Sequence, residues 1–88
     1  MGEDLRQKII DIICEEWPTP DGYLQSATIY ERLINEGVEV PDRAMSAVLL
    51  RQAEDGRITL AVDTSHADDE VRRHGAMTIH HVSPELCL

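Results

Sequence analysis

Arginine is the residue type in this sequence best suited to recognising a charged partner. The planar guanidinium group donates two parallel hydrogen bonds to a phosphate, or to the O6 and N7 atoms of guanine. Of the eight lysine and arginine residues, five fall in two later segments of the chain: Arg43, Arg51, Arg57, Arg72 and Arg73. Their clustering makes these segments the candidates for contact with phosphates or bases.

Histidine and cysteine are the other residue types with chemistry of their own. Neighbouring residues on a strand point to opposite faces, so His80 and His81 do not converge on one metal ion. His66 and His74 have no nearby cysteine or fixed carboxylate, and zinc sites show tighter ligand spacing. The sequence also has no paired carboxylates, phosphate-binding glycine loop or nucleophile–histidine pattern. We expect no metal, no cofactor and no enzymatic activity.

The two cysteines, Cys14 and Cys87, lie far apart and follow no disulfide or metal-binding pattern. We therefore expect two reduced thiols. No apolar run approaches the ~18 residues of a membrane-spanning helix. Residues 1–4 have neither the basic start nor the apolar stretch of a signal peptide. These features predict a cytoplasmic protein that does not enter a membrane.

One domain is the most that 88 residues support, because a chain of this length buries only about 60–65% of its unfolded surface. A stripe with helical spacing predicts a first helix over about residues 4–16, formed by Leu5, Ile9, Ile12, Ile13 and Trp17. Asp4 and Gln7 fit a capping box at its start. Ile10 lies off the stripe, which indicates a wide buried face.

A second helix is predicted over about residues 26–36. Ser26 is favoured over Thr28 as its N-cap, and Gly37 suits the position after a helix where φ is positive. Residues 23–25 precede this helix and are long enough only for a bridge strand. We expect this short strand to pair with a later hairpin.

A third helix is predicted over about residues 42–54, with Asp42 as N-cap after Pro41 and Gly56 as the stop. At about 100° per residue, its inward side carries Met45, Val48, Leu49, Gln52 and Ala53. Its outward side carries Arg43, Ala47, Arg51 and Glu54, with Ser46 and Leu50 at the border. Two of the clustered arginines are thus expected on the solvent face of this helix.

Two alternating runs, residues 57–63 and 77–82, predict a β-hairpin. In the second run, Met77, Ile79 and His81 are expected on the face opposite Thr78, His80 and Val82. The connecting loop, residues 64–76, is long, and loops of this length commonly carry function. The apolar tail at residues 85–88 is expected to pack either on the first helix or on a partner chain.

The order helix, short strand, helix, turn, helix, hairpin resembles the winged helix-turn-helix domains. The residues that carry the resemblance are Ser26–Ile29 with Leu33, then Ala44, Val48 and Leu49, and the passage Glu54–Ile58 (acidic, acidic, Gly, any, Ile). The resemblance implies an α+β fold of three helices with a β-hairpin wing at about residues 57–82 and a short third strand. It also implies a bacterial, archaeal or viral transcription regulator that binds duplex DNA, commonly as a homodimer.

In such domains the third helix enters the major groove. The candidate DNA-binding residues are therefore Arg43, Ser46, Ala47 and Arg51 on the helix, with Arg72 and Arg73 on the wing. Ala47 is small enough to let the helix approach the groove closely. Homodimerisation, through the first helix or a terminal element, would double the number of arginines offered to the DNA.

The overall charge opposes this function. The net charge is −9, which repels a phosphate backbone at long range. Arg51 also has the i, i+4 spacing that pairs it with Asp55, so the arginines can be ordinary solvated or paired charges. The alternative hypothesis is a winged helix that binds another protein without contacting DNA and whose acidic surface imitates DNA. The negative charge, Leu50 and the apolar tail favour it.

Overall fold

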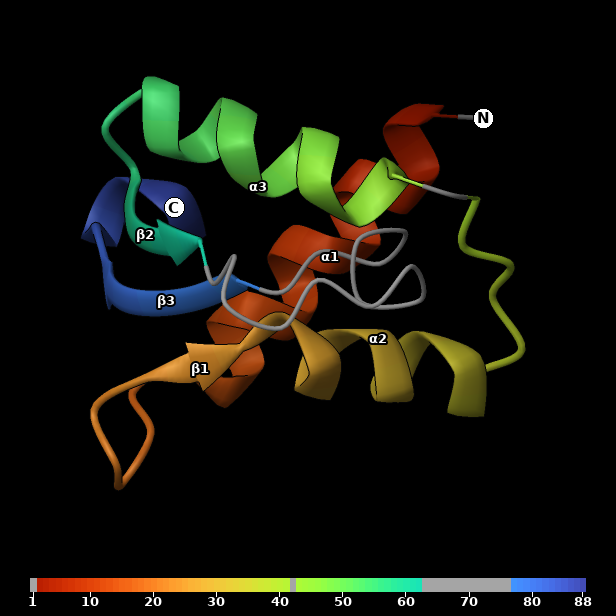
Figure 1. Cartoon of the computed structure of the whole chain (residues 1–88), viewed down its shortest axis with the longest axis horizontal. Coiled ribbons are helices and arrows are strands. Elements are labelled where there is room, and N and C mark those ends of the chain that lie inside the picture. The colour runs from red at the N-terminus through yellow and green to blue at the C-terminus, as the bar shows by residue number, and fades with distance from the viewer. Residues whose placement is uncertain (1, 42, 63–76) are drawn as a thin grey trace.

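The structure is a computed structural model of the chain, and it describes residues 2–41, 43–62 and 77–88. The helices in this part are α1 (Gly2–Glu16), α2 (Ser26–Asn35) and α3 (Ala44–Glu54). The strands are β1 (Leu24–Gln25), β2 (Ile58–Val62) and β3 (Met77–Val82), followed by the 3-10 helix η1 (Pro84–Cys87) (Figure 1). The described elements surround one core, and the expected α+β class is confirmed. None of these helices is both long and apolar enough to cross a membrane.

The first helix, α1, begins at Gly2, two residues before its predicted start. Asp4 therefore lies inside the helix, and the predicted capping box with Gln7 is wrong. Gln7 Nε2 instead donates a hydrogen bond to Asp11 Oδ1 at 2.9 Å, one turn further along the helix. The predicted wide buried face is confirmed, because Ile9, Ile10, Ile12 and Ile13 are all buried.

The start of α2 differs from the prediction. Ser26 is the first residue of the helix and follows β1 directly, with Gln25 in the N-cap position. Ser26 is therefore not the N-cap. Its side chain is buried, and its Oγ accepts a hydrogen bond from the backbone N–H of Met77 at 3.1 Å. The cause is the pairing of β1 with β3, which places the first turn of α2 beside the start of β3.

Gly37 ends α2 as predicted. Its φ is +76°, a conformation that favours glycine. The Val38 N–H donates to the Leu33 carbonyl at 2.9 Å, and the Gly37 N–H donates to the Ile34 carbonyl at 3.0 Å. These two hydrogen bonds form a Schellman motif, which turns the chain out of α2 and towards α3.

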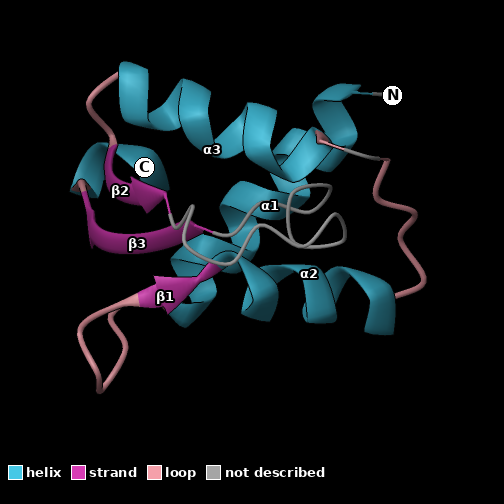
Figure 2. Ribbon diagram, in the orientation of Figure 1, coloured by secondary structure: helices cyan, strands magenta, loops and turns pink. Residues whose placement is uncertain are grey.

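The central strand of the sheet is β3, in the order β1-β3-β2. β1 pairs antiparallel with β3, with Leu24 opposite Ile79, so the predicted bridge strand is confirmed. β2 and β3 form the predicted hairpin. In the view of Figure 2 this sheet lies at one end of the helices, and α1 runs between α3 and α2.

A β-bulge in β3 overturns the predicted alternation of that strand. Thr59 lies opposite His81 and Leu60 lies opposite Ile79, so His80 is the extra residue on β3. One inserted residue reverses the inward and outward pattern beyond it. Val82 is consequently buried and His81 is exposed, the reverse of the prediction, and His80 is exposed as well.

An ion-pair group joins α1 to α2 outside the core. Arg32 Nη2 lies 2.6 Å from Glu15 Oε2, and Arg32 Nη1 lies 3.3 Å from Glu16 Oε1. The hydrogen bond with Glu15 raises the pKa of Arg32 above its ordinary value, because a carboxylate partner favours the charged guanidinium. The pair links the end of α1 to α2 at the surface, where such pairs contribute about 0–1 kcal/mol.

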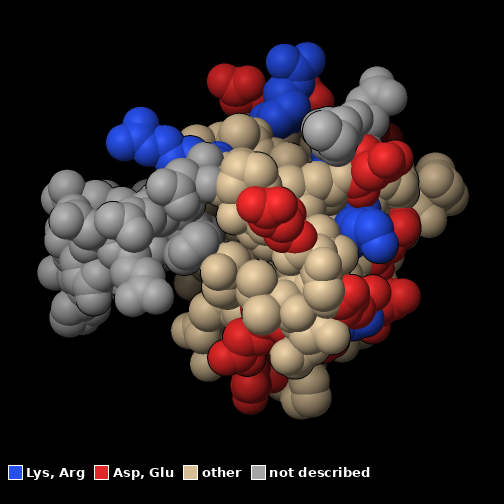
Figure 3. All heavy atoms as spheres, turned by 90° about the vertical axis from the view of Figure 1, so that its right-hand side faces the viewer, with Lys and Arg blue, Asp and Glu red and all other residues tan. Residues whose placement is uncertain are grey.

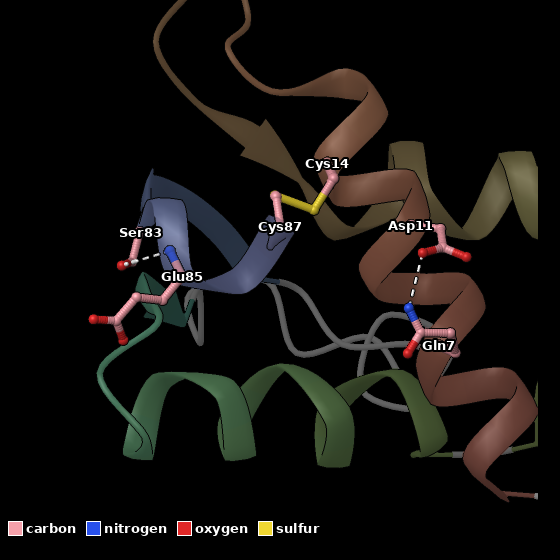
Figure 4. Close-up of a disulfide and its surroundings, with 6 residues drawn as sticks. All are labelled: Gln7, Asp11, Cys14, Ser83, Glu85 and Cys87. Carbon is pink, nitrogen blue, oxygen red and sulfur yellow. Dashed lines mark hydrogen bonds between the residues drawn. A yellow bond between two sulfur atoms is a disulfide. The ribbon is translucent and has the colours of Figure 1, made fainter.

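The C-terminal segment packs on α1. η1 contacts α1 and buries Leu86, which confirms the first of the two expectations for the tail. Cys87 forms a disulfide with Cys14 (Figure 4), and the two Cα atoms are 5.7 Å apart, within the usual range for a disulfide. The expectation of two reduced thiols is therefore wrong. Packing of the tail on α1 brings the cysteines together although 73 residues separate them.

Candidate nucleic-acid interface

The helix α3 turns one side to the core and the other to solvent. Met45, Leu49 and Gln52 are fully buried, whereas Ala47 and Arg51 are exposed. This division follows the periodicity that the sequence predicts. Because α3 runs along the upper rim of the molecule in Figure 2, its exposed side belongs to the outer surface.

Arg43 precedes α3 and is not part of it. The helix begins at Ala44, two residues later than predicted, and Arg43 occupies the N-cap position with φ of +68°. The Ala44 N–H donates to the Pro41 carbonyl at 3.1 Å, and the Ala47 N–H donates to the Arg43 carbonyl at 2.9 Å. Arg43 is exposed, but its left-handed backbone takes it out of the helical stripe. Asp42 lies outside the described residues, and because Arg43 holds the N-cap position, the prediction of Asp42 as N-cap is wrong.

Arg51 takes part in a surface ion pair, as its spacing predicts. Its Nε lies 3.4 Å from Asp55 Oδ2, and the two side chains are 69% and 38% exposed. An exposed pair of this kind contributes about 0–1 kcal/mol. A phosphate or a guanine edge can therefore replace Asp55 as the partner of Arg51 at small cost.

The surface beside these arginines carries two short side chains and one exposed leucine. Ala47 is exposed and Ser46 is half-buried, and both side chains are short. Leu50 is 46% exposed. Together they allow a partner to approach the α3 backbone closely, whether that partner is a groove of DNA or another protein.

Gln52 offers nothing to an external ligand, because it is fully buried. In the described part of the chain neither its Oε1 nor its Nε2 has a hydrogen-bond partner. An unpaired buried polar group costs about 1–3 kcal/mol. The sequence prediction that Gln52 turns inward is confirmed, but the periodicity gives no sign that its amide is left unpaired.

The C-terminal end of α3 is tied to the segment that leads into η1. The Arg57 N–H donates to the Gln52 carbonyl at 3.0 Å, and the Ser83 N–H donates to the Arg57 carbonyl at 2.7 Å. Gly56 stops the helix as predicted, with φ of +75°. Arg57 is half-buried, so this member of the arginine cluster bridges α3 and the end of β3 through its backbone.

The charges around α3 are mixed. Figure 3 views the molecule from the side of the α2–α3 connection. Basic side chains stand near its upper edge, where α3 runs, with acidic side chains directly beside them. On the described part of this face the basic groups stand singly and do not merge into one continuous patch. Arg43 and Arg51 are therefore set in an acidic background.

Four of the remaining candidate residues lie outside the described residues. They are Arg72 and Arg73 of the expected wing, and His66 and His74. Among the residues that are described, no group of three or more His, Cys, Asp or Glu side chains could hold a metal ion.

No family model, curated protein or solved structure matches this chain. The winged helix-turn-helix assignment thus stays a resemblance in the order of elements, and a function has to be argued from the residues themselves.

The residues that sequence reasoning missed are the two cysteines. Their spacing carries no signal, because a single pair that is 73 residues apart fits no motif. The available signal was indirect. Cys87 belongs to an apolar tail expected to pack on the first helix, and Cys14 lies on that helix.

Proposed function

We propose that this domain is a winged helix-turn-helix that binds duplex DNA as a transcription regulator, with α3 in the major groove. The observation that carries the proposal is the exposed side of α3, where Ala47 and Arg51 follow the exposed Arg43. Ser46 lies at the edge of the same side. The element order α1-β1-α2-α3-β2-β3 and the antiparallel sheet support the assignment of the fold.

The affinity of such a domain has to come from few cations. Phosphate contacts supply most non-specific affinity for DNA, and the α3 surface offers Arg43 and Arg51, with Arg72 and Arg73 proposed to add contacts from the wing. The net charge of −9 opposes binding at long range, although salt screens this repulsion beyond about 10 Å at 0.1 M. We therefore propose a homodimer, which doubles the arginine contacts made at close range.

The dimer contact cannot use the main apolar stripe of α1. Ile9, Ile10, Ile12 and Ile13 are buried within one chain, and η1 covers part of the same helix. A sedimenting species of twice the chain mass of 9.9 kDa would support the dimer. A species of the single-chain mass at high micromolar concentration would contradict it.

The test of DNA binding is a fluorescence-anisotropy titration of random duplex DNA, begun at ~20 mM salt, where phosphate contacts are strongest. Arg43→Ala and Arg51→Ala should each lower the affinity by about 3–10-fold and reduce the salt slope by about 1. Arg6→Ala is the matched control, because it removes an equally exposed cation from α1. The proposal fails if Arg6→Ala weakens binding as much as Arg43→Ala and Arg51→Ala do.

A protein-binding function is the second candidate, and the exposure of Leu50 favours it. Leu50 is 46% exposed beside Arg51, where an apolar side chain contributes little to phosphate recognition. An acidic domain that meets a basic protein through this surface would imitate DNA. Absence of any duplex binding at ~20 mM salt would favour this candidate over the first.

We place the domain in the cytoplasm, with the DNA that it is proposed to bind. The Cys14–Cys87 disulfide is unusual for a cytoplasmic protein. Disulfides are rare in the cytosol, where reductants keep thiols reduced, and cytosolic examples in mesophiles are usually catalytic or redox-sensing. In the cytoplasm the disulfide would therefore meet reductants that can reduce it.

A further inference from the structure

The C-terminal turn η1 is held on α1 by two kinds of contact, one apolar and one covalent. Leu86 is its buried residue, and Cys87 forms the disulfide with Cys14 of α1 (Figure 4). The hydrogen bonds within the segment are local. The Leu86 N–H donates to the Ser83 carbonyl at 3.1 Å, and the Glu85 N–H donates to Ser83 Oγ at 3.4 Å. These bonds shape the turn but do not attach it to α1.

We infer that the Cys14–Cys87 disulfide is a redox-operated latch, which holds η1 on α1 when oxidised and releases η1 when reduced. Ordering the backbone of four residues costs more free energy than the burial of one leucine returns. The disulfide supplies the difference by fixing Cys87 against α1. Without it, η1 leaves α1 and exposes Leu86.

The exposure of the two cysteine residues decides which of them a reductant attacks first. Cys87 is the more exposed residue of the pair and Cys14 is half-buried, so we assign the first attack to Cys87 Sγ, by one thiolate of a dithiol reductant. This step breaks the Sγ–Sγ bond, forms a mixed disulfide on Cys87 and leaves Cys14 as a thiolate, which takes up a proton. The second thiol of the reductant, after losing its proton, attacks the first and releases Cys87, which is protonated in turn. The reductant leaves as a disulfide, having given two electrons and two protons.

The release of η1 reaches α3 through backbone hydrogen bonds. Ser83 is the N-cap of η1, and its N–H donates to the Arg57 carbonyl at 2.7 Å. The Arg57 N–H donates in turn to the Gln52 carbonyl of α3 at 3.0 Å. When η1 moves freely, these two bonds open more often, and the end of α3 that carries Arg51 becomes less fixed. The effect on DNA rests on the proposed function, whereas the latch itself does not.

Amide hydrogen exchange tests the latch without any DNA. It compares the oxidised protein, the same protein in dithiothreitol, and the Cys14→Ser/Cys87→Ser double variant. In both forms without the disulfide, the Leu86, Ser83 and Arg57 amides should exchange about tenfold faster than in the oxidised protein and should still exchange faster than Ile79 at the centre of β3. The Ile79 rate reports global unfolding, and it rises as well because the disulfide closes a long loop. Removal of the dithiothreitol and reoxidation should restore the slow rates. Equal rates at Leu86 and Ser83 in the oxidised and reduced protein would overturn the latch. So would equal protection of Leu86, Ser83 and Ile79 in the reduced protein, which would show that η1 opens only when the whole fold unfolds.

A parallel titration with random duplex DNA tests the coupling to α3. Reduction should weaken binding by about 3–10-fold, equivalent to roughly 0.6–1.4 kcal/mol. Equal affinity of the oxidised and reduced protein would overturn the coupling. If neither form binds DNA, the proposed function fails while the exchange rates still decide the latch.

Discussion

Ser26 and Met77 are joined by a hydrogen bond of 3.1 Å, from the Met77 backbone N–H to the Ser26 Oγ, although 51 residues separate them. Both residues are buried, and the bond fixes the first turn of α2 to the start of β3. Replacing Ser26 with Ala leaves the Met77 N–H buried without this acceptor. We expect Ser26→Ala to lower the free energy of unfolding by about 1–3 kcal/mol, measured by urea denaturation.

Ala27→Ser is the matched control for that substitution. Ala27 is the next residue of α2 and is exposed, so adding a hydroxyl there should change stability by less than about 0.5 kcal/mol. Equal midpoints for Ser26→Ala and the wild-type protein would show that the bond between α2 and β3 contributes no net stability.

The buried amide of Gln52 predicts a substitution that stabilises the protein. Its Oε1 and Nε2 have no partner in the described part of the chain, and methionine has a similar shape without hydrogen-bonding groups that need a partner. Gln52→Met should therefore raise the free energy of unfolding by about 1–2 kcal/mol and the Tm by roughly 5–10 °C, measured by calorimetry. Gln25→Met, at an exposed glutamine, should leave the Tm nearly unchanged. A lower Tm for Gln52→Met would show that the amide is hydrogen-bonded in solution, for example by buried water.

Arg43 combines an unfavourable backbone with a proposed role in binding, and two substitutions separate these effects. Its φ of +68° is costly for a residue with a Cβ atom and easy for glycine. Arg43→Gly should raise the free energy of unfolding by about 0.5–1 kcal/mol, whereas Arg43→Ala should not. Both should weaken duplex binding to the same extent, since both remove the guanidinium. Higher affinity in Arg43→Gly than in Arg43→Ala would indicate that the backbone at residue 43, and not the charge, controls binding.

The sequence predicts those parts of this fold that depend on local patterns. The stripe of α1, the two-sided division of α3 and the positive φ of Gly37 follow from periodicity and from glycine's backbone freedom. The strand pairing of residues 24–25 follows from their place between two helices. The first three depend on residues that are close in the chain, whereas the strand pairing joins Leu24 to the distant Ile79.

The features that the sequence does not predict depend on contacts between distant residues. Ser26 looks like an N-cap by type, but its hydroxyl bonds to Met77 because β3 lies beside it. The bulge at His80 has no marker residue and appears only in the register with β2. The pairing of Cys14 with Cys87 depends on where the C-terminal turn packs. On the candidate site, the exposure of Ala47 and Arg51 was predictable, and the left-handed backbone of Arg43 was not.

Replacing Asp55 with Asn should strengthen the proposed DNA binding, because it frees Arg51 from its ion pair. Its Oδ2 lies 3.4 Å from Arg51 Nε, so in the proposed complex it would compete with a DNA phosphate for that guanidinium. Asp55→Asn removes the competing charge and leaves the side chain nearly the same size. Duplex affinity at ~50 mM salt should rise by about 3–10-fold, with stability within about 0.5 kcal/mol of wild type. Glu54→Gln controls for the loss of negative charge, because it removes an exposed acid from the same end of α3. Repulsion of nearby phosphates falls by a similar amount in both variants, so a larger gain for Asp55→Asn isolates the release of Arg51. Equal gains would show that the loss of negative charge at this end of α3 explains the effect and that the release of Arg51 adds nothing.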